Sequence, residues 1–141
     1  MMETSFLKGG LRSMTNTELM IYTILGPTRH NTLPLSYAID LAIELLFTKN
    51  IAMDDICVTK DLYRPVAQQL GKSVSATSRQ IVRLSNLCWD AIRDSGEVER
   101  YIGKPIRDLH APNEMIFYFA FLLHFGRPFF QVVQRQPELL F

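Results

Sequence analysis

The stretch MIFYFAFLLHF, residues Met115–Phe125, constrains the fold of this chain more than any other part of the sequence. As a helix, it would carry apolar side chains almost all the way around its axis, and such a helix has to be buried on all sides. It is about half as long as a membrane-spanning helix needs to be. The sequence therefore predicts that this stretch lies in the core of the protein.

Two arrangements would complete the burial of this helix. The tail Phe129–Phe141 is apolar enough to pack against its outer face. Alternatively, a second copy of the chain covers that face, which would make the protein a homodimer. The side chains expected in such a dimer contact are Ile116, Phe117, Phe119, Phe121 and Leu122. The sequence leaves both arrangements open.

The rest of the chain also has helical rather than strand periodicity. Asn-Gly and Asp-Gly hairpin turns do not occur in it, and runs of alternating apolar and polar residues are absent. We therefore predict one all-α domain over residues 1–141, of which residues 126–141 form an apolar C-terminal extension. The six predicted helices of this domain span approximately residues 15–25, 34–50, 59–70, 75–94, 97–108 and 114–125.

The composition is that of an ordinary globular protein, since 48% of the residues are apolar and 21% are charged. Residues Met1–Leu11 contain no apolar run of the length found in leader peptides, so a cytoplasmic location is expected. Cys57 and Cys88 lie far apart in the sequence and are expected to be buried thiols. Because no cysteines or histidines have the spacing of metal ligands, we predict neither a metal nor another cofactor.

The sequence offers little for catalysis. His30, His110 and His124 are scattered along the chain without partners at a catalytic or ligand spacing. The serines between Ser73 and Ser78 are not flanked by the glycines of a nucleophile elbow, and helix capping explains them better. A glycine-rich loop that would hold a phosphate group is also missing. We therefore predict that the protein is not an enzyme.

Positive charge is concentrated in one stretch, although the whole chain has a net charge of only +1. Residues 58–83 contain five Lys or Arg residues and one Asp, a net charge of +4, which leaves −3 for the remainder. A basic patch on a mildly acidic body is a weak form of the charge distribution typical of nucleic-acid-binding proteins.

The predicted helix over residues 75–94 fits this interpretation. Its first turns are basic, whereas Asp90 and Asp94 lie near its end, a polarity that suits a helix whose N-terminal half enters the major groove. The residues predicted to contact bases are Ser75, Ser78, Arg79, Gln80 and Arg83, and those predicted to contact phosphates are Lys60, Arg64 and Lys72. The expected buried stripe of the same helix is Thr77, Ile81, Leu84, Cys88 and Ala91 or Ile92. A solvated helix face is the alternative that the charge pattern leaves open.

The helix predicted over residues 59–70 would be the first half of a helix-turn-helix. Ala67 is small enough to let two helices approach closely, and Gly71 permits a turn between them. Pro65 lies inside this helix and predicts a late start or a slight kink. The segment GKSVS, residues 71–75, is longer than the usual turn of roughly three to four residues, so the motif is expected to be irregular.

The stretch Thr59–Trp89 also carries a specific residue pattern. It matches T-K-x-L-Y-x-x-[IV]-A, then S-x-x-x-R-x-I, then a tryptophan, without a gap. The matching positions are Thr59, Lys60, Leu62, Tyr63, Val66, Ala67, Ser75, Arg79, Ile81 and Trp89. In this pattern the chain resembles the DNA-binding effector domain of the sporulation-initiation response regulators of spore-forming bacteria. A weaker likeness extends over residues 25–125.

The resemblance implies a six-helix fold, sequence-specific binding of double-stranded DNA through residues 75–83, and transcriptional control. In that family two copies bind adjacent DNA boxes as a tandem dimer. Ala76 and Ser78 depart from the family pattern, because family members usually carry arginine and glutamate there. The DNA sequence that the family binds is therefore not transferred to this chain. The alternating strand–helix pattern of a receiver domain is absent as well, so regulation by phosphorylation of an attached receiver is not expected.

A protein–protein module is the alternative function. An effector-like domain with an altered base-reading face could pair with a full-length regulator and hold it inactive. The residues at Ala76 and Ser78 and the apolar helix favour this hypothesis, whereas the retained Lys72, Arg79 and Arg83 argue against it. Non-specific coating of DNA is a third hypothesis.

Overall fold

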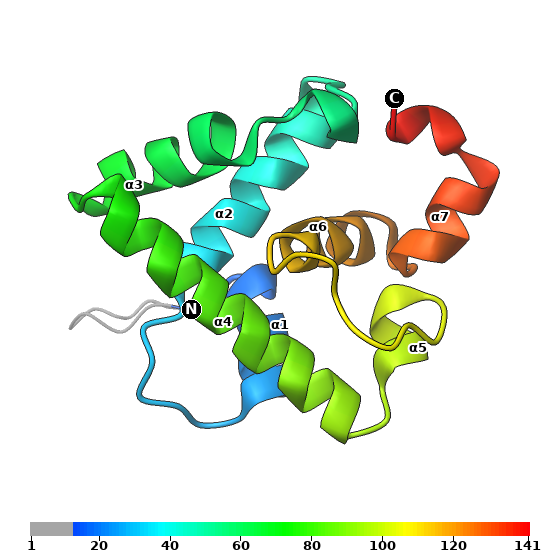
Figure 1. Cartoon of the computed structure of the whole chain (residues 1–141), viewed down its shortest axis with the longest axis horizontal. Helices are drawn as coiled ribbons and strands as arrows, with labels where there is room; N and C mark the ends of the chain where they lie inside the picture. Colours follow the sequence, from blue (N-terminus) through cyan, green and yellow to red (C-terminus); the bar gives the residue numbers. More distant parts are fainter. Residues whose placement is uncertain (1–12) are drawn as a thin grey trace.

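The computed structural model describes residues 13–141, and in that range it contains helices and no strands (Figure 1). Its α-helices are α1 (Asn16–Leu25), α2 (Leu33–Ile43), α3 (Arg64–Leu70), α4 (Val74–Asp94), α5 (Val98–Ile102), α6 (Glu114–Phe125) and α7 (Phe129–Arg135). The π-helical segments are η1 (Glu44–Thr48) and η3 (Val58–Tyr63), and the 3-10 turns are η2 (Met53–Asp55) and η4 (Pro137–Leu139).

The all-α prediction is thus confirmed. The predicted number of six helices was one too low for the described range, because the C-terminal extension itself forms α7. Residues 1–12, on which the prediction of no leader peptide depends, lie outside the described residues.

The boundaries of α1 follow from its capping residues. The Thr15 hydroxyl accepts a hydrogen bond from the Glu18 N–H, and the Glu18 carboxylate accepts one from the Thr15 N–H. This capping box satisfies two of the amide groups that the start of a helix leaves without partners. Gly26 ends the helix with a φ of 72°, a conformation that glycine adopts at little cost.

The chain before α3 winds as a π-helix. The Arg64 N–H donates to the carbonyl of Thr59, five residues earlier. Pro65 has no N–H group to continue a regular ladder of hydrogen bonds, so the winding changes next to it. The regular helix consequently begins at Arg64 rather than near residue 59, which is the late start that Pro65 predicted.

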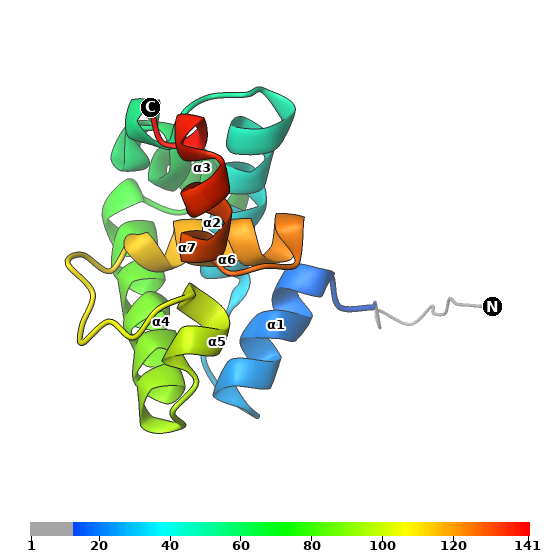
Figure 2. The same cartoon turned by 90° about the vertical axis from the view of Figure 1, so that its right-hand side faces the viewer.

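Helix α6 occupies the centre of the fold, with α2 on one side and α5 and α7 on others (Figures 1 and 2). Every residue from Met115 to Phe121 is buried. Phe129 of α7 makes edge-to-face contacts with Tyr118 and Phe121, at ring-centroid distances of 5.1 and 4.9 Å. The C-terminal extension therefore covers the outer face of α6, as one of the two predicted arrangements required.

This packing bears on the predicted dimer contact. The side chains of Ile116, Phe117, Phe119 and Phe121 are no more than 7% exposed, and Leu122 is half-buried. Because these side chains pack inside the protomer, they do not form an open contact surface in this fold. Whether two copies associate stays a prediction.

Between residues 13 and 141, no single helix is both long enough and apolar enough to cross a membrane. Within the same range, α6 and α7 taken together reach the necessary length and composition, and the pair is bent by 71° at the break between them. The first two turns of α6 are buried against neighbouring helices.

A hydrogen bond between α1 and α2 holds a carboxyl group in a partly buried position. The Thr17 hydroxyl donates to Oδ1 of Asp40. Burial raises the pKa of Asp40 above its ordinary value of 3.8; the Thr17 hydrogen bond lowers this pKa and the nearby charge of Glu18 raises it further. The folded state therefore keeps the Asp40 proton to a higher pH than the unfolded chain does. As the pH rises above 3.8, ionisation of Asp40 removes stability from the fold.

We predict that Phe119→Ala lowers the free energy of unfolding by about 3–5 kcal/mol, because Phe119 is fully buried and its removal leaves a cavity in the core. Urea unfolding followed by circular dichroism measures this loss. Phe141→Ala is the matched control, since Phe141 is 78% exposed and its truncation should change stability by less than about 0.5 kcal/mol. Equal losses from the two substitutions would contradict the central position of α6.

Asp40→Asn should raise the urea midpoint at pH 7, because asparagine can still accept the Thr17 hydrogen bond but carries no charge to desolvate. The difference between the variant and the wild type should shrink as the pH falls and vanish below 3.8, where the wild-type carboxyl group becomes protonated in both states. Unfolding curves at several pH values test this. A difference that is independent of pH would show that ionisation of Asp40 is not its cause.

Candidate nucleic-acid interface

Helix α4 lies along one side of the molecule and crosses the front of the view in Figure 1. Its buried residues are Thr77, Ile81, Leu84, Ser85, Cys88, Trp89 and Ile92, which include all but the alternative Ala91 of the predicted stripe. Burial also raises the pKa of the Cys88 thiol to about 12, so this thiol is neutral at physiological pH. The opposite side of α4 is left to the solvent.

The connection between α3 and α4 is short. It consists of Gly71, Lys72 and Ser73, because Val74 is already helical. Gly71 adopts φ 67° and ψ 35°, and the N–H of Lys72 reaches back to the carbonyl of Ala67 at 3.0 Å, the hydrogen-bonding pattern of a Schellman motif at a helix end.

The predicted long turn was therefore wrong. Both Ser73 and Ser75 are residue types that cap helices, and the structure uses the first: the Ser73 hydroxyl accepts a hydrogen bond from the Ala76 N–H at 3.1 Å. Ser75 thus lies within the first turn of α4 rather than before it. A connection of three residues is within the range of helix-turn-helix motifs.

Small side chains of α3 and α4 are buried on either side of this connection. Ala67 of α3 is 1% exposed and Thr77 of α4 is fully buried, and the two helices are in contact. Contact with α3 therefore helps to hold α4 in place.

Arg79 and Arg83 lie one helical turn apart on the exposed side of α4. The Arg79 guanidinium donates a hydrogen bond to the Ser75 hydroxyl at 3.2 Å. Both arginines border two shallow depressions of about 520 and 340 Å³. The smaller depression brings them together with Lys72, Ala76 and Gln80, and the larger one extends from Ser78 towards Asp90.

Ser78 and Gln80 lie on the two borders of this exposed face rather than at its centre, since each residue advances a helix by about 100°. Both side chains are half-buried. The Ser78 hydroxyl donates to the backbone carbonyl of Ser75 at 3.0 Å, and the side-chain carbonyl of Gln80 is buried without a hydrogen-bond partner in the described structure. Of the five residues predicted to contact bases, Ser75, Arg79 and Arg83 are therefore the exposed ones.

Charges are segregated along α4. Within residues 13–141, no carboxylate forms an ion pair with Lys72, Arg79 or Arg83. At the other end of the helix, Arg93 pairs with Asp90 at 3.4 Å and with Asp94 at 3.3 Å. The first half of α4 is thus a basic surface with free cations, and the second half is neutralised internally.

The other two predicted phosphate contacts lie on the preceding segment. Lys60 belongs to η3 and Arg64 begins α3, and both are exposed and form no ion pair with a described residue. Neither lines the depressions around Arg79. The structure therefore groups Lys72 with the two arginines and leaves Lys60 and Arg64 as separate cations nearer the start of the motif.

Val82 and Leu87 line the larger depression, although the sequence did not assign them to the site. Both are half-buried. Val82 lies three residues after Arg79, and Leu87 lies four residues after Arg83. This spacing along one helix was the sequence signal that places them on this face.

The remaining candidate ligands and nucleophiles are dispersed. In the described part of the chain, no three His, Cys, Asp or Glu side chains converge as a metal site. Cys57 is exposed, so the prediction of two buried thiols was wrong for this residue and right for Cys88. Cys57 belongs to the irregular connection before η3, where its N–H donates to the Asp61 carboxylate at 2.8 Å.

Comparisons with protein families, with curated proteins and with solved structures found no match to this chain.

Proposed function

We propose that this protein binds double-stranded DNA through the exposed face of the first half of α4 and regulates transcription. The observation that carries the proposal is the pair Arg79 and Arg83, one turn apart, exposed and not neutralised by any described carboxylate. The three-residue connection to α3 and the resemblance of residues 59–89 to a DNA-binding effector domain support it.

The proposed contacts follow from the geometry of α4. A single α-helix fits the major groove, and arginine forms paired hydrogen bonds with the acceptor edge of guanine. Arg79 and Arg83 would contact bases, with Ser75 next to Arg79 at 3.2 Å. Lys72, in the turn before the helix, would reach a phosphate, and Lys60 and Arg64 would contact the backbone farther along the duplex.

Ala76 and Ser78 determine which sequences this face can distinguish. Ala76 presents only a methyl group, and the Ser78 hydroxyl is bonded to the helix backbone. These side chains carry no charge beside Arg79, so the preferred DNA sequence should differ from the one bound by the family that the chain resembles. Losing a charged base contact shifts preference by about 1–3 kcal/mol per position.

A protein-binding role is the second candidate, and one observation favours it. Helix α1 and the residue before its cap expose large apolar side chains: Leu19 is 52% exposed, Tyr22 44% and Met14 53%. Leu19 and Tyr22 lie three residues apart and therefore share one side of α1. An exposed apolar helix side is typical of a protein contact, so α1 is the surface through which pairing with a full-length regulator would occur.

Selection from a pool of random DNA duplexes separates these functions. We predict that repeated selection with the purified protein enriches a short motif containing guanines, because Arg79 and Arg83 are exposed for base contacts. Retention of duplexes without enrichment would indicate non-specific coating. Absence of DNA retention would overturn the proposal, and tight binding to a regulator that Leu19→Glu abolishes would then support the protein-binding role.

Arg79→Ala should weaken binding to the selected duplex by about 1–3 kcal/mol and change binding to random duplex little. Lys72→Ala should weaken binding to both duplexes alike and reduce the slope of log affinity against log salt by about one. Gel-shift titrations at two salt concentrations measure both effects. Arg100→Ala is the matched control, because Arg100 lies on α5 and pairs with Glu97. Equal, non-selective losses from the Arg79 and Lys72 substitutions would contradict this division of roles.

A further inference from the structure

A pocket of about 770 Å³ lies between α6, α7 and the loop 103–112 that joins α5 to α6. Small-molecule sites in proteins have volumes of roughly 300–1,000 Å³. The pocket is more enclosed than the depressions along α4, and it contains no residue of α4. It is therefore a separate site from the proposed DNA-binding face.

Aromatic rings form the inner wall of this pocket. Phe117 and Tyr118 come from α6, and Phe129 and Phe130 come from α7. Phe129 and Phe130 meet at a ring-centroid distance of 5.0 Å and an angle of 87°, and Tyr118 lies 5.9 Å from Phe130. Rings packed against one another in this way give a rigid apolar surface on which a ring-sized ligand can lie.

Lys104 holds a positive charge at one end of the pocket. Its ammonium group lies 4.2 Å from the centre of the Phe130 ring, a cation–π contact. Gly103 makes this approach possible: a Cβ atom there would lie 3.1 Å from both Cβ and the backbone nitrogen of Phe130, and its φ is 106°. Neither Lys104 nor Arg107, which also lines the pocket, forms an ion pair with a described carboxylate.

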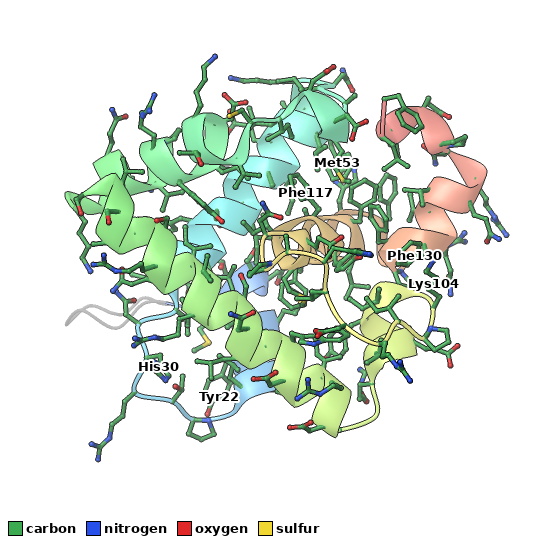
Figure 3. The ribbon with its side chains drawn as sticks, viewed as in Figure 1. Tyr22, His30, Met53, Lys104, Phe117 and Phe130 are labelled. Atoms are coloured by element: carbon green, nitrogen blue, oxygen red, sulfur yellow. The ribbon has the colours of Figure 1, made fainter. Side chains whose placement is uncertain are left out.

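Three acidic residues line the pocket too, and two of them are already engaged. The Glu114 carboxylate accepts hydrogen bonds from the N–H groups of His110 and Ala111 at 2.7 and 3.3 Å, and its other oxygen lies 3.7 Å from His110 Nδ1. Asp108 accepts a hydrogen bond from the Leu109 N–H at 2.8 Å. The third acidic residue is Asp54, which follows Met53 in the sequence. Figure 3 shows Met53 and Lys104 at opposite ends of the pocket lining, with Phe117 and Phe130 between them.

Tyr118 adds a hydrogen-bond donor to the wall. Its hydroxyl makes no hydrogen bond within residues 13–141. Burial, followed by the nearby charge of Glu114, raises the pKa of Tyr118 to about 12, so the hydroxyl keeps its proton at physiological pH. Among the described residues, the pocket thus combines an apolar wall and one phenolic donor with two cations that form no ion pair and the three carboxylates of Asp54, Asp108 and Glu114.

We propose that this pocket binds a small monocarboxylic acid with an apolar, ring-sized body. The carboxylate binds at the end marked by Lys104, and the body lies against Phe117, Phe129 and Phe130. The opposite end, at Met53 and Asp54, disfavours a second anionic group. This inference does not depend on the DNA-binding function, since the two sites share no residue.

Titration of the ¹⁵N-labelled full chain with 4-phenylbutyrate, followed by amide chemical shifts, tests the proposal. Its uncharged analogue, 4-phenylbutan-1-ol, is titrated in parallel. We expect saturable shifts in the loop 103–112 and around Phe117 and Phe130, with the carboxylate binding about two- to fivefold more tightly than the alcohol, as an exposed ion pair allows. Absence of saturable shifts at these residues, or equal affinity for the two probes, would overturn it.

Two variants assign the contacts. Lys104→Met keeps an apolar stem against Phe130 but removes the charge, so it should abolish the preference for the carboxylate and leave the affinity for the alcohol unchanged. Leu109→Trp places a larger side chain in the pocket and should abolish binding of both probes. Lys49→Met is the matched control, because Lys49 pairs with Glu44 outside the pocket. A carboxylate preference that survives Lys104→Met would refute the proposed mode of binding.

Discussion

The structure depends on the burial of α6 on all sides. This helix has no polar face, so neighbouring elements have to cover it, and the contacts with α2, α5 and α7 bury its residues from Met115 to Phe121. The rings of Tyr118 and Phe121 against Phe129 fix where the C-terminal extension folds back. Helix α2 packs against α6. The helix α4, with its buried stripe, in turn packs against α2 and α1. The core thereby determines which side of α4 remains in the solvent.

The charge arrangement on that solvent side supports the proposed binding surface over an ordinary solvated helix. A solvated face is stabilised when opposite charges alternate at three- or four-residue spacing, which α4 does only in its second half, around Arg93. In the first half, Arg79 and Arg83 are like charges four residues apart, an arrangement that costs roughly 0.2–0.5 kcal/mol. In the second half, Asp90 and Asp94 are also like charges four residues apart, but Arg93 pairs with both of them. Arg79 and Arg83 have no such counter-charge among residues 13–141, which supports the proposed contact with a partner outside the protomer.

The structural features that depend on interactions between residues close together in the sequence were the ones that the sequence predicted. The stop at Gly71 and the buried stripe of α4 depend on residues within one or two turns, and both occur as the residue types indicate. The length of the turn was mispredicted because Ser73 and Ser75 are both residue types that cap helices, and residue type alone does not select between them. The extra helix α7, the exposure of Cys57 and the aromatic pocket depend on segments far apart in the sequence. Such contacts leave no periodic pattern in either segment.

The side chains around Arg79 limit how the proposed interface can distinguish DNA sequences. Ala76 and Ser78 are too short to orient a guanidinium group, so the Ser75 hydroxyl, 3.2 Å away, is the group that positions Arg79 before any partner arrives. Arg83 has no hydrogen-bond partner among residues 13–141 and keeps its rotational freedom. Because ordering such a side chain costs conformational entropy, Arg79 should contribute more to discrimination than Arg83. On this argument, the specificity of the face resides mainly in one pre-positioned arginine, and the surrounding cations supply affinity for the backbone of any duplex.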